Sequence, residues 1–425
     1  MPLTGRVLCL LALVLVALLA AVPTPASAQG LDDVDCVIVP DLPECDDEED
    51  TGDEIPNTPV MPVAPFTPPL VDPRGVDPRS PNPLNGLGWY VDKSRWVPQW
   101  RQYRHFQRSG QRGKAAMLGK IALQPQFRWF GRWNEDEQGG IAGVMRRYLQ
   151  RVQREQPGTV PQIVTLRHQG KECHSRYKAG GAAEDARTRR WFRSFARGVG
   201  TARVVIGFEP DSVGTINCLA RSRRKARMDV LRYGIDVLSQ LPNATIYIEA
   251  SASDWTNHRV VAKRLRYIGV AKVRGFMLNV THYDWTGRNI RYGRKISRLV
   301  GGKHFIVSTS FNGRGPVHYR RWINRKKYKW RRITVWCHPL RRGLGIAPTT
   351  QTGDGLADAF LYVGRPGYSG GDCNGGPLPI GSWYSDRALM FARFATGWTG
   401  PPRGFRYGWP RGLSLRAVAG DQLQR

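Results

Sequence analysis

Carboxyl groups follow two apolar segments of this 425-residue chain at the points where those segments end. Residues 202–208 run directly into Glu209 and Asp211, and residues 163–166 lead to a loop that contains Glu172. A carboxyl group beside buried apolar residues loses hydration, which raises its pKa and keeps it protonated. A protonated carboxyl can act as a general acid, so these segment ends are candidates for an active site.

Apolar segments with strand composition alternate with longer amphipathic segments from about residue 85 onward. This alternation predicts βαβ units and an α/β fold with a parallel sheet. Seven or eight such units in about 330 residues favour a barrel over an open sheet, and a barrel places function at the C-terminal strand ends. Strands are expected at residues 88–91, 116–123, 162–166, 202–208, 244–249, 275–279, 304–308 and 358–363, and helices at 139–155, 185–199, 222–240 and 258–268.

The net charge of +30, from 64 Lys and Arg against 34 Asp and Glu, is unevenly distributed along the chain. Residues 31–54 hold 12 acidic and no basic side chains, whereas residues 81–425 hold 61 basic and 20 acidic ones. Such an excess predicts binding to a polyanion, here an anionic cell-wall polymer. A surface adapted by the host organism, with arginine at solvated positions, explains the charge equally well. The hydrophobic content of 41% excludes a chain that is disordered throughout.

The first 28 residues follow the plan of a secretory signal peptide: Arg6, then an apolar run, then small residues ending at Ala28. An uncleaved membrane anchor is the alternative. A cleaved signal predicts a secreted, extracellular protein without a specific nucleic-acid partner. No transmembrane span is expected after cleavage, because no later apolar run reaches about 18 residues. The expected organisation is signal peptide 1–28, acidic and then Pro-rich linker 29–80, barrel domain 81–400 and basic C-terminal tail 401–425.

The run of residues 204–212, an apolar strand that ends in Glu-Pro-Asp-Ser, resembles the most specific signature of glycoside hydrolase family 6. This is the family of inverting β-1,4-glucanases and cellobiohydrolases. Further segments resemble the family in the same order along about 300 residues. The resemblance implies a distorted (β/α) barrel that holds a glucan chain and needs no cofactor. These further segments are 82–84 with 88–91, 125–129, 247–250 with Trp255, 279–283, 309–313 and 336–353.

The resemblance implies a role for individual residues where they match the family. Asp211 matches the general acid, and Glu172 stands where the family has an aspartate that supports the acid. The ordinary alternatives are a strand-end cap for Asp211, a surface ion pair for Glu172 and core packing for the tryptophans. Substrate binding is expected at Trp129, Trp255, Asn279, Trp336 and Tyr368, and disulfides are expected between Cys173 and Cys218 and between Cys337 and Cys373.

The chain departs from the family at the position of the catalytic base, which is Gly370. Water activation could fall to Glu172, Asp372 or Asp254, and the sequence does not choose among them. Three functions remain open: a glycoside hydrolase that cleaves β-1,4-glucan with inversion, a non-catalytic carbohydrate- or cell-wall-binding protein that lost its base, or a polyanion-binding surface protein. No metal site is expected, because the eight His lack HExxH spacing and the Cys lack CxxC pairs.

Overall fold

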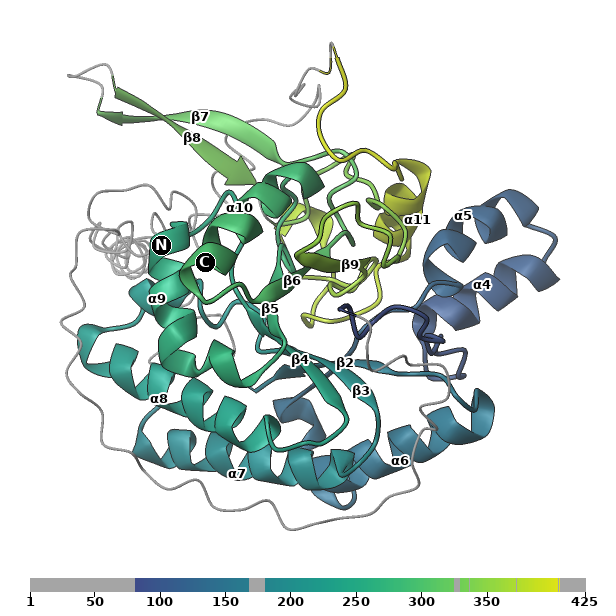
Figure 1. Ribbon diagram of the computed structural model, residues 1–425. Helices are drawn as coiled ribbons and strands as arrows, with labels where there is room; N and C mark the ends of the chain where they lie inside the picture. The colour runs from purple at the N-terminus through teal and green to yellow at the C-terminus, as the bar shows by residue number, and fades with distance from the viewer. Residues whose placement is uncertain are drawn as a thin grey trace, which may run out of the picture. The chain divides into compact units, whose positions relative to one another are not determined.

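Seven parallel strands form the central sheet, in the order β1-β2-β3-β4-β5-β6-β9 (Figure 1). The computed structural model describes residues 81–167, 180–324, 329–335, 337–371, 373–403 and 405, all within the unit Asp33–Arg425. The strands of the sheet are β1 (Arg128–Gly131), β2 (Gln162–Leu166), β3 (Val204–Phe208), β4 (Ala244–Glu249), β5 (Gly275–Leu278), β6 (His304–Ser308) and β9 (Ala357–Leu361).

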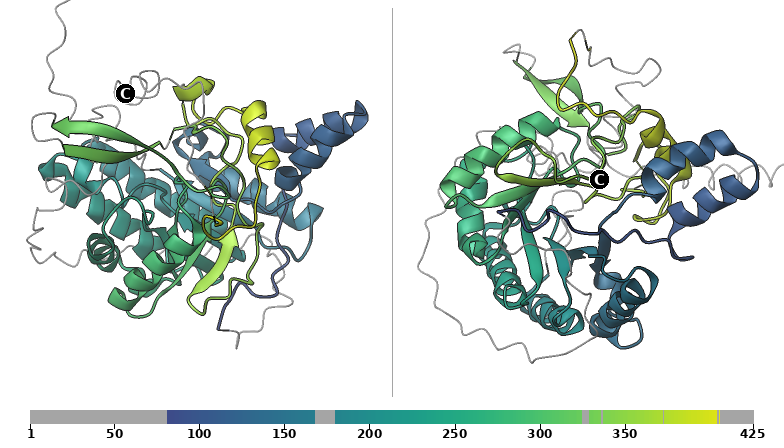
Figure 2. Two further views of the ribbon diagram at one scale, coloured as in Figure 1. Left: turned by 90° about the horizontal axis from the view of Figure 1, so that it is seen from above. Right: turned by 45° about the vertical axis from the view of Figure 1, so that its right-hand side comes forward.

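Helices connect the successive strands from β1 to β6 and cover the outer side of the sheet, as both views of Figure 2 show. In α9, the buried residues Val261, Ala262, Leu265 and Ile268 recur at helical spacing and form one apolar face. The connecting helices are α6 (Gly140–Glu155), α7 (Ala182–Val199), α8 (Arg221–Leu238), α9 (His258–Ile268) and α10 (Thr286–Leu299), and the helices outside this series are α4 (Pro98–Arg108), α5 (Arg112–Ala122) and α11 (Ser385–Arg393).

The alternation of side chains along each strand divides the core into two layers. In β3, Val204, Ile206 and Phe208 belong to the large cluster that also contains helix residues, whereas Val205 belongs to a smaller cluster of strand residues. Successive side chains of a strand point to opposite faces, so the smaller cluster fills the inner side of the curved sheet. Parallel strands that are buried on both faces have continuous apolar sequences, which is what the sequence of β3 shows.

The two edges of the sheet meet at one β-bridge in the described part of the chain, between Gln126 before β1 and Tyr362 after β9. The backbone N–H of Phe127 donates to the carbonyl of Tyr362 at 3.1 Å. The barrel is therefore distorted, because β1 and β9 do not form a continuous ladder. The expected α/β fold with a distorted barrel is confirmed.

A buried ion-pair network fixes the barrel interior around Asp358, the second residue of β9. Its carboxylate accepts hydrogen bonds from the hydroxyl of Tyr247 at 2.6 Å and from the guanidinium of Arg274 at 2.8 and 2.9 Å. The Nδ1 atom of His304 lies 2.9 Å from the same carboxylate. Buried charges need such partners, so this network holds β4, β6 and β9 in register.

Two expected strands are wrong. Residues 116–123 fall largely in helix α5, where Leu118, Ile121 and Ala122 are buried at helical spacing. A short apolar run does not distinguish a strand from a buried helix, and the contact of α5 with α11 decided the outcome. At residues 88–91 there is an isolated bridge from Trp89 to Val160 instead of a strand. Helices α4, α10 and α11 were not among the helices expected from the sequence.

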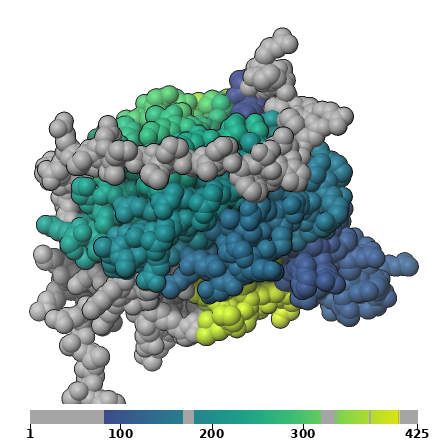
Figure 3. All heavy atoms as spheres, turned by 90° about the horizontal axis from the view of Figure 1, so that it is seen from below, coloured from purple at the N-terminus to yellow at the C-terminus, as the bar shows by residue number. Residues whose placement is uncertain are grey.

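The chain brings α5 and α11 together although many residues separate them, and both contribute to one apolar cluster. In the space-filling view, the yellow C-terminal segment borders the blue segment of α4 and α5 (Figure 3). A separate antiparallel hairpin, β7 (Val317–Asn324) with β8 (Lys329–Val335), forms its own two-stranded sheet. No helix in the described part of the chain is both long and apolar enough to cross a bilayer.

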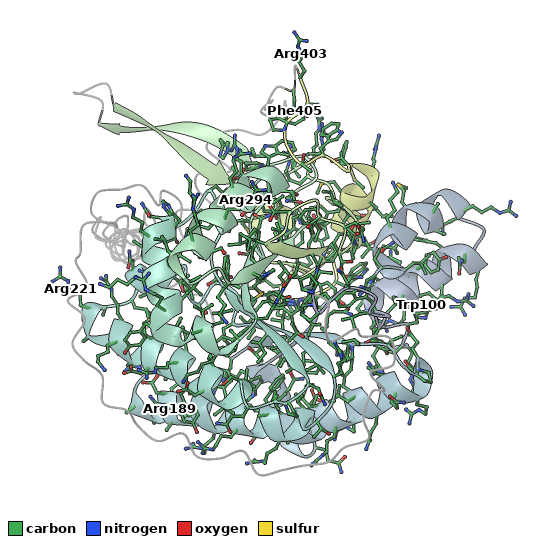
Figure 4. All side chains as sticks on the ribbon, viewed as in Figure 1. Trp100, Arg189, Arg221, Arg294, Arg403 and Phe405 are labelled. Carbon is green, nitrogen blue, oxygen red and sulfur yellow. The ribbon has the colours of Figure 1, made fainter. Side chains whose placement is uncertain are left out.

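Basic side chains are spread over several helices of the described surface. Figure 4 labels Arg189 on α7, Arg221 on α8, Arg294 on α10 and Arg403 near the C-terminal end of the described chain. Arg221, Arg294 and Arg403 are exposed. The basic excess is thus not confined to one element.

Candidate active site

Asp211 lies in the loop that leaves β3 at the C-terminal edge of the sheet. Glu209 and Asp211 both have positive φ angles, 51° and 67°, which non-glycine residues rarely adopt outside functional sites. The Thr281 hydroxyl donates to Oδ1 of Asp211 at 2.6 Å. Glu209 is buried and accepts the backbone N–H of Arg167 at 3.0 Å on each oxygen, which anchors the start of the loop. The loop thus holds the Asp211 carboxyl in a defined orientation.

Glu249, the last residue of β4, supplies a second carboxyl next to Asp211. It is buried and accepts backbone N–H groups from Val213 at 2.7 Å, from Gly214 at 3.3 Å and from Ser251. Burial, followed by the charge of Asp211, raises the pKa of Glu249 to about 8 despite these donors. Two carboxyl groups in one site do not both ionise readily, so this site holds a proton near neutral pH. The sequence signal for Glu249 was a carboxyl that ends an apolar strand.

A buried dyad of His282 and Asp254 lies beside the two carboxyl groups. The Nδ1 atom of His282 is 3.0 Å from Oδ1 of Asp254, and the imidazole stacks on Trp255 with ring centroids 4.7 Å apart. Burial lowers the pKa of His282, but Asp254 outweighs burial and leaves the pKa above its ordinary value. Burial likewise raises the pKa of Asp254, but His282 outweighs it and leaves that pKa below its ordinary value. The pairing therefore favours the imidazolium form of His282 and the carboxylate form of Asp254.

A third carboxyl, Asp284, extends this cluster from the loop before α10. The Ser253 hydroxyl donates to Oδ2 of Asp284 at 2.6 Å, and Arg288 lies 3.2 Å from Oδ1. Burial and the charge of Asp254 raise the pKa of Asp284 to about 6. The loops after β3, β4 and β5 thus gather several titratable groups at one edge of the sheet, as expected for the C-terminal edge of a barrel.

Two of the residues expected to bind substrate, Trp255 and Asn279, are buried. Trp255 is 6% exposed, and its ring packs so closely on Gly214 that a β-carbon there would lie 2.4 Å from it. The side-chain amide of Asn279 donates to the carbonyls of Asp284 at 3.2 Å and Ser308 at 3.1 Å. Asn279 therefore joins the loop after β5 to the end of β6.

Trp129 and Tyr368, two further residues expected to bind substrate, both contact the guanidinium group of Arg365. The Arg365 guanidinium carbon is 5.0 Å from the ring centroid of Trp129 and 4.8 Å from that of Tyr368. The Trp129 indole N–H donates to the carbonyl of Val363 at 2.8 Å, and the Tyr368 hydroxyl donates to Gln99 at 2.9 Å. Arg365 was not among the site residues expected from the sequence, because its neighbour Trp129 is remote along the chain.

Gly370, which was expected to stand at the position of the family's base, is exposed and carries no carboxyl. Its backbone N–H donates to Nε2 of His338 at 2.9 Å. Burial, with a contribution from Arg387, lowers the pKa of His338 to about 4, so its imidazole is neutral and accepts this hydrogen bond. A β-carbon built on Gly370 meets only His338 Nε2, at 3.7 Å, which leaves room for a side chain.

Other expected site residues lie outside the part of the chain that the structure describes. They are Glu172, Cys173, Trp336 and Asp372, and the side chain of Cys373 is likewise outside it. Within the described residues, no three or more His, Cys, Asp or Glu side chains gather in a way that could hold a metal ion.

A curled parallel β/α sheet with carboxyl groups gathered at its C-terminal edge is the arrangement of a β/α-barrel glycoside hydrolase. The sequence model of glycosyl hydrolases family 6 matches residues 88–391, and the chain belongs to this family. Endoglucanase A of Cellulomonas fimi is 33% identical over 319 residues, which are 74% of this chain and 62% of that protein. Endoglucanase 1 of Streptomyces halstedii is 28% identical over 68% of this chain and 83% of its own length.

Among solved structures, the endoglucanase Cel6 from Mycobacterium tuberculosis is similar, with a TM-score of 0.63 and 32% identity. The match covers 74% of this chain and 99% of that one. That endoglucanase was solved in complex with a methyl-cellobiosyl-4-deoxy-4-thio-β-D-cellobioside. The family and its fold are thereby established for this chain, which spans less than two thirds of the Cellulomonas fimi relative.

Proposed function

We propose that this chain is a secreted glycoside hydrolase that cleaves β-1,4-glucan with inversion, with Asp211 as the general acid and Glu172 assisting it. An inverting glycosidase needs a protonated carboxyl at the leaving oxygen and a base that activates water on the opposite face of the sugar. The position of Asp211 carries the proposal. Its carboxyl lies at the C-terminal end of β3, accepts the Thr281 hydroxyl at 2.6 Å and lies close enough to Glu249 to raise that residue's pKa.

Glu249 serves the acid in this proposal by holding a proton. With a pKa of about 8, its carboxyl is protonated at neutral pH, so the two neighbouring carboxyl groups together keep one proton in the site for the acid step. The endoglucanase names of the relatives support a β-1,4-glucan as substrate. Trp129, Trp255, Asn279, Trp336 and Tyr368 stay proposed as substrate-binding residues.

The base is proposed to be Glu172 or Asp372. Asp254 is disfavoured for this role, because its ion pair with His282 lowers its pKa and makes it a weaker base. The alternative function is a non-catalytic carbohydrate-binding protein, and the observation that favours it is the absence of a side chain at Gly370.

Hydrolysis of soluble β-glucans by the wild type and by Asp211→Asn tests the enzyme proposal. We expect reducing ends to appear with the wild type and at least a hundredfold more slowly with the variant. Proton NMR of the first products should record the α-anomer, as inversion requires. Binding of glucan by both proteins without hydrolysis by either would instead support the non-catalytic alternative.

The proposed organisation includes the signal peptide 1–28, the linker 29–80, the catalytic domain 81–400 and the basic tail 401–425. It also includes disulfides between Cys173 and Cys218 and between Cys337 and Cys373. Cys218 and Cys337 each take part in a disulfide bond, which supports the pairing. Mass mapping of unreduced peptides tests it, and recovery of any of these four cysteines as a free thiol would count against it.

An anionic cell-wall polymer is proposed as a further partner. The register of the β7–β8 hairpin sets Arg320 opposite Arg332 and Arg321 opposite Arg331. Basic residues from both strands therefore fall at opposed register positions of one hairpin, and a concentration of basic residues favours binding of a polyanion. The double variant Arg321→Ser/Arg331→Ser should elute from a heparin column at lower salt than the wild type. If the double variant elutes at the same salt concentration as the wild type, these two arginines do not contribute to polyanion binding.

A further inference from the structure

Arg365 is a cation in contact with two aromatic rings at the C-terminal edge of the sheet. Its guanidinium carbon lies 5.0 Å from the ring centroid of Trp129 and 4.8 Å from that of Tyr368. Both rings are themselves held by hydrogen bonds, Trp129 to the carbonyl of Val363 and Tyr368 to Gln99. The cation is therefore held in place by its neighbours, and its side chain is half-buried.

The charges around Arg365 do not balance it. Burial lowers the pKa of Arg365, Tyr368 raises it by a smaller amount, and the nearby charge of Arg128 lowers it. The carboxylate of Asp92 is engaged by other cations, Arg128 at 3.0 Å and Arg151 at 2.8 Å. In the part of the chain that the structure describes, Arg365 has no hydrogen bond or ion pair to a carboxylate. The segment 364–371 contains no other charged residue.

A guanidinium that contacts aromatic rings still has in-plane N–H donors for hydrogen bonding. These donors form a fork that fits two oxygens of a carboxylate, sulfate or phosphate group. The aromatic contacts hold the fork in place before a ligand arrives, which reduces the entropy lost on binding. A half-buried cation is also stabilised when an anion joins it.

We propose that Arg365, held by Trp129 and Tyr368, binds an oxyanion substituent on the polysaccharide, so that the substrate is an acidic β-1,4-glucan and not a neutral one. This inference rests on the proposed function, because it assumes that a glucan chain passes Trp129. It assigns Arg365 to substrate selection and gives it no part in bond cleavage.

Affinity electrophoresis in gels that contain one soluble polymer tests the inference without requiring turnover. The probes are carboxymethylcellulose, cellulose sulfate and the neutral hydroxyethylcellulose, and the dissociation constant comes from the retardation. We expect the wild type to bind at least one of the anionic polymers about tenfold more tightly than the neutral one. The comparison of the two anionic polymers identifies which oxyanion the site accepts.

The decisive variant is Arg365→Gln, which should lose the tenfold preference and bind hydroxyethylcellulose within about twofold of the wild type. Arg403→Gln is the matched control, because it removes the same charge from an exposed arginine that extends away from the body in Figure 4. If the anionic polymers were bound only through the protein's net charge of +30, both variants would lose equally little affinity for them. Arg365→Lys should keep only part of the preference, since an ammonium lacks the planar fork.

If Arg365→Gln fails to fold, Tyr368→Glu takes its place, because it sets a carboxylate against the guanidinium as an internal competitor. That variant should also lose the preference for the anionic polymer. Equal binding of neutral and anionic polymers by the wild type would overturn the inference and leave the proposed function intact. A preference that survives in Arg365→Gln or Tyr368→Glu would overturn it as well. Failure of the wild type to bind or cleave any of the three polymers would overturn both.

Discussion

The Thr281 hydroxyl donates a 2.6 Å hydrogen bond to Oδ1 of Asp211 and so joins the loop after β5 to the loop after β3. A carboxyl on a loop with positive φ angles needs such a contact to keep one orientation. Orientation by a neighbouring group is what distinguishes a general acid from an ordinary strand-end carboxyl.

Removal of that hydroxyl should slow glucan hydrolysis. Thr281→Val keeps the shape of the side chain but loses the donor, and we expect kcat to fall about tenfold, which corresponds to one hydrogen bond. Thr281→Ser keeps the hydroxyl and should retain most of the activity. Initial rates over a range of substrate concentrations separate kcat from KM. A Thr281→Val enzyme with wild-type kcat would mean that Thr281 does not orient Asp211.

A carboxyl introduced at Gly370 should increase the rate. The backbone there has room, because a β-carbon meets only His338 Nε2 at 3.7 Å. A positioned general base typically contributes between about a hundredfold and ten thousandfold, so Gly370→Asp should raise kcat at least tenfold even with imperfect geometry. Gly370→Asn is the control of equal size without a basic oxygen. Equal rates for the two variants would argue that another residue already activates the water.

Glu249 should make the stability of the fold depend on pH. Its pKa rises from 4.5 to about 8 on folding, so between those pH values the folded chain binds more protons than the unfolded chain. The free energy of unfolding of the wild type therefore falls as pH rises through this range, by about 1.4 kcal/mol for each pH unit. Glu249→Gln removes this dependence. Urea denaturation of both proteins at several pH values checks it, and parallel curves would contradict the raised pKa.

The Asp254 and His282 pair should show a coupling energy that depends on pH. The raised pKa of His282 means that its stabilisation is complete below about pH 6.5 and is lost as pH rises through the folded pKa. The lowered pKa of Asp254 means that its stabilisation is present above about pH 4 and is lost as pH falls. A double-mutant cycle with Asp254→Asn and His282→Gln should give about 2 kcal/mol between those values.

That coupling should decline on both sides of the window from about pH 4 to about pH 6.5. The cycle is best measured by urea denaturation of the four proteins at matched ionic strength. A coupling energy that is constant with pH would mean that the two groups form a hydrogen bond without an ion pair.

Asp358→Asn should destabilise the barrel strongly. The substitution leaves Arg274 without its buried carboxylate partner, and loss of one partner of a buried ion pair costs about 3 to 5 kcal/mol. Lys225→Gln is the surface comparison, because its pair with Asp229 is exposed and should contribute less than about 1 kcal/mol. Thermal and urea denaturation of both variants measure the two losses of stability. Equal losses in the two variants would contradict this prediction.

The strands of the sheet could be predicted well because their signal is local. The expected strands at 162–166, 244–249 and 304–308 coincide with β2, β4 and β6, and the expected helix at 258–268 coincides with α9. Each is a run of apolar residues with the period of its element, bounded by turn residues. The strand predicted at residues 116–123 was wrong, because a short apolar run fits both a strand and a helix.

The sequence by itself determined the family, the alternation of strands and helices, and the position of Asp211 at a strand end. It also determined that Gly370 offers no carboxyl. Only the tertiary structure decided which side chains meet. The contacts of Thr281 with Asp211 and of Arg365 with Trp129 join segments that are remote in sequence. Such contacts depend on strand register and loop path, which local hydrophobic patterns do not encode.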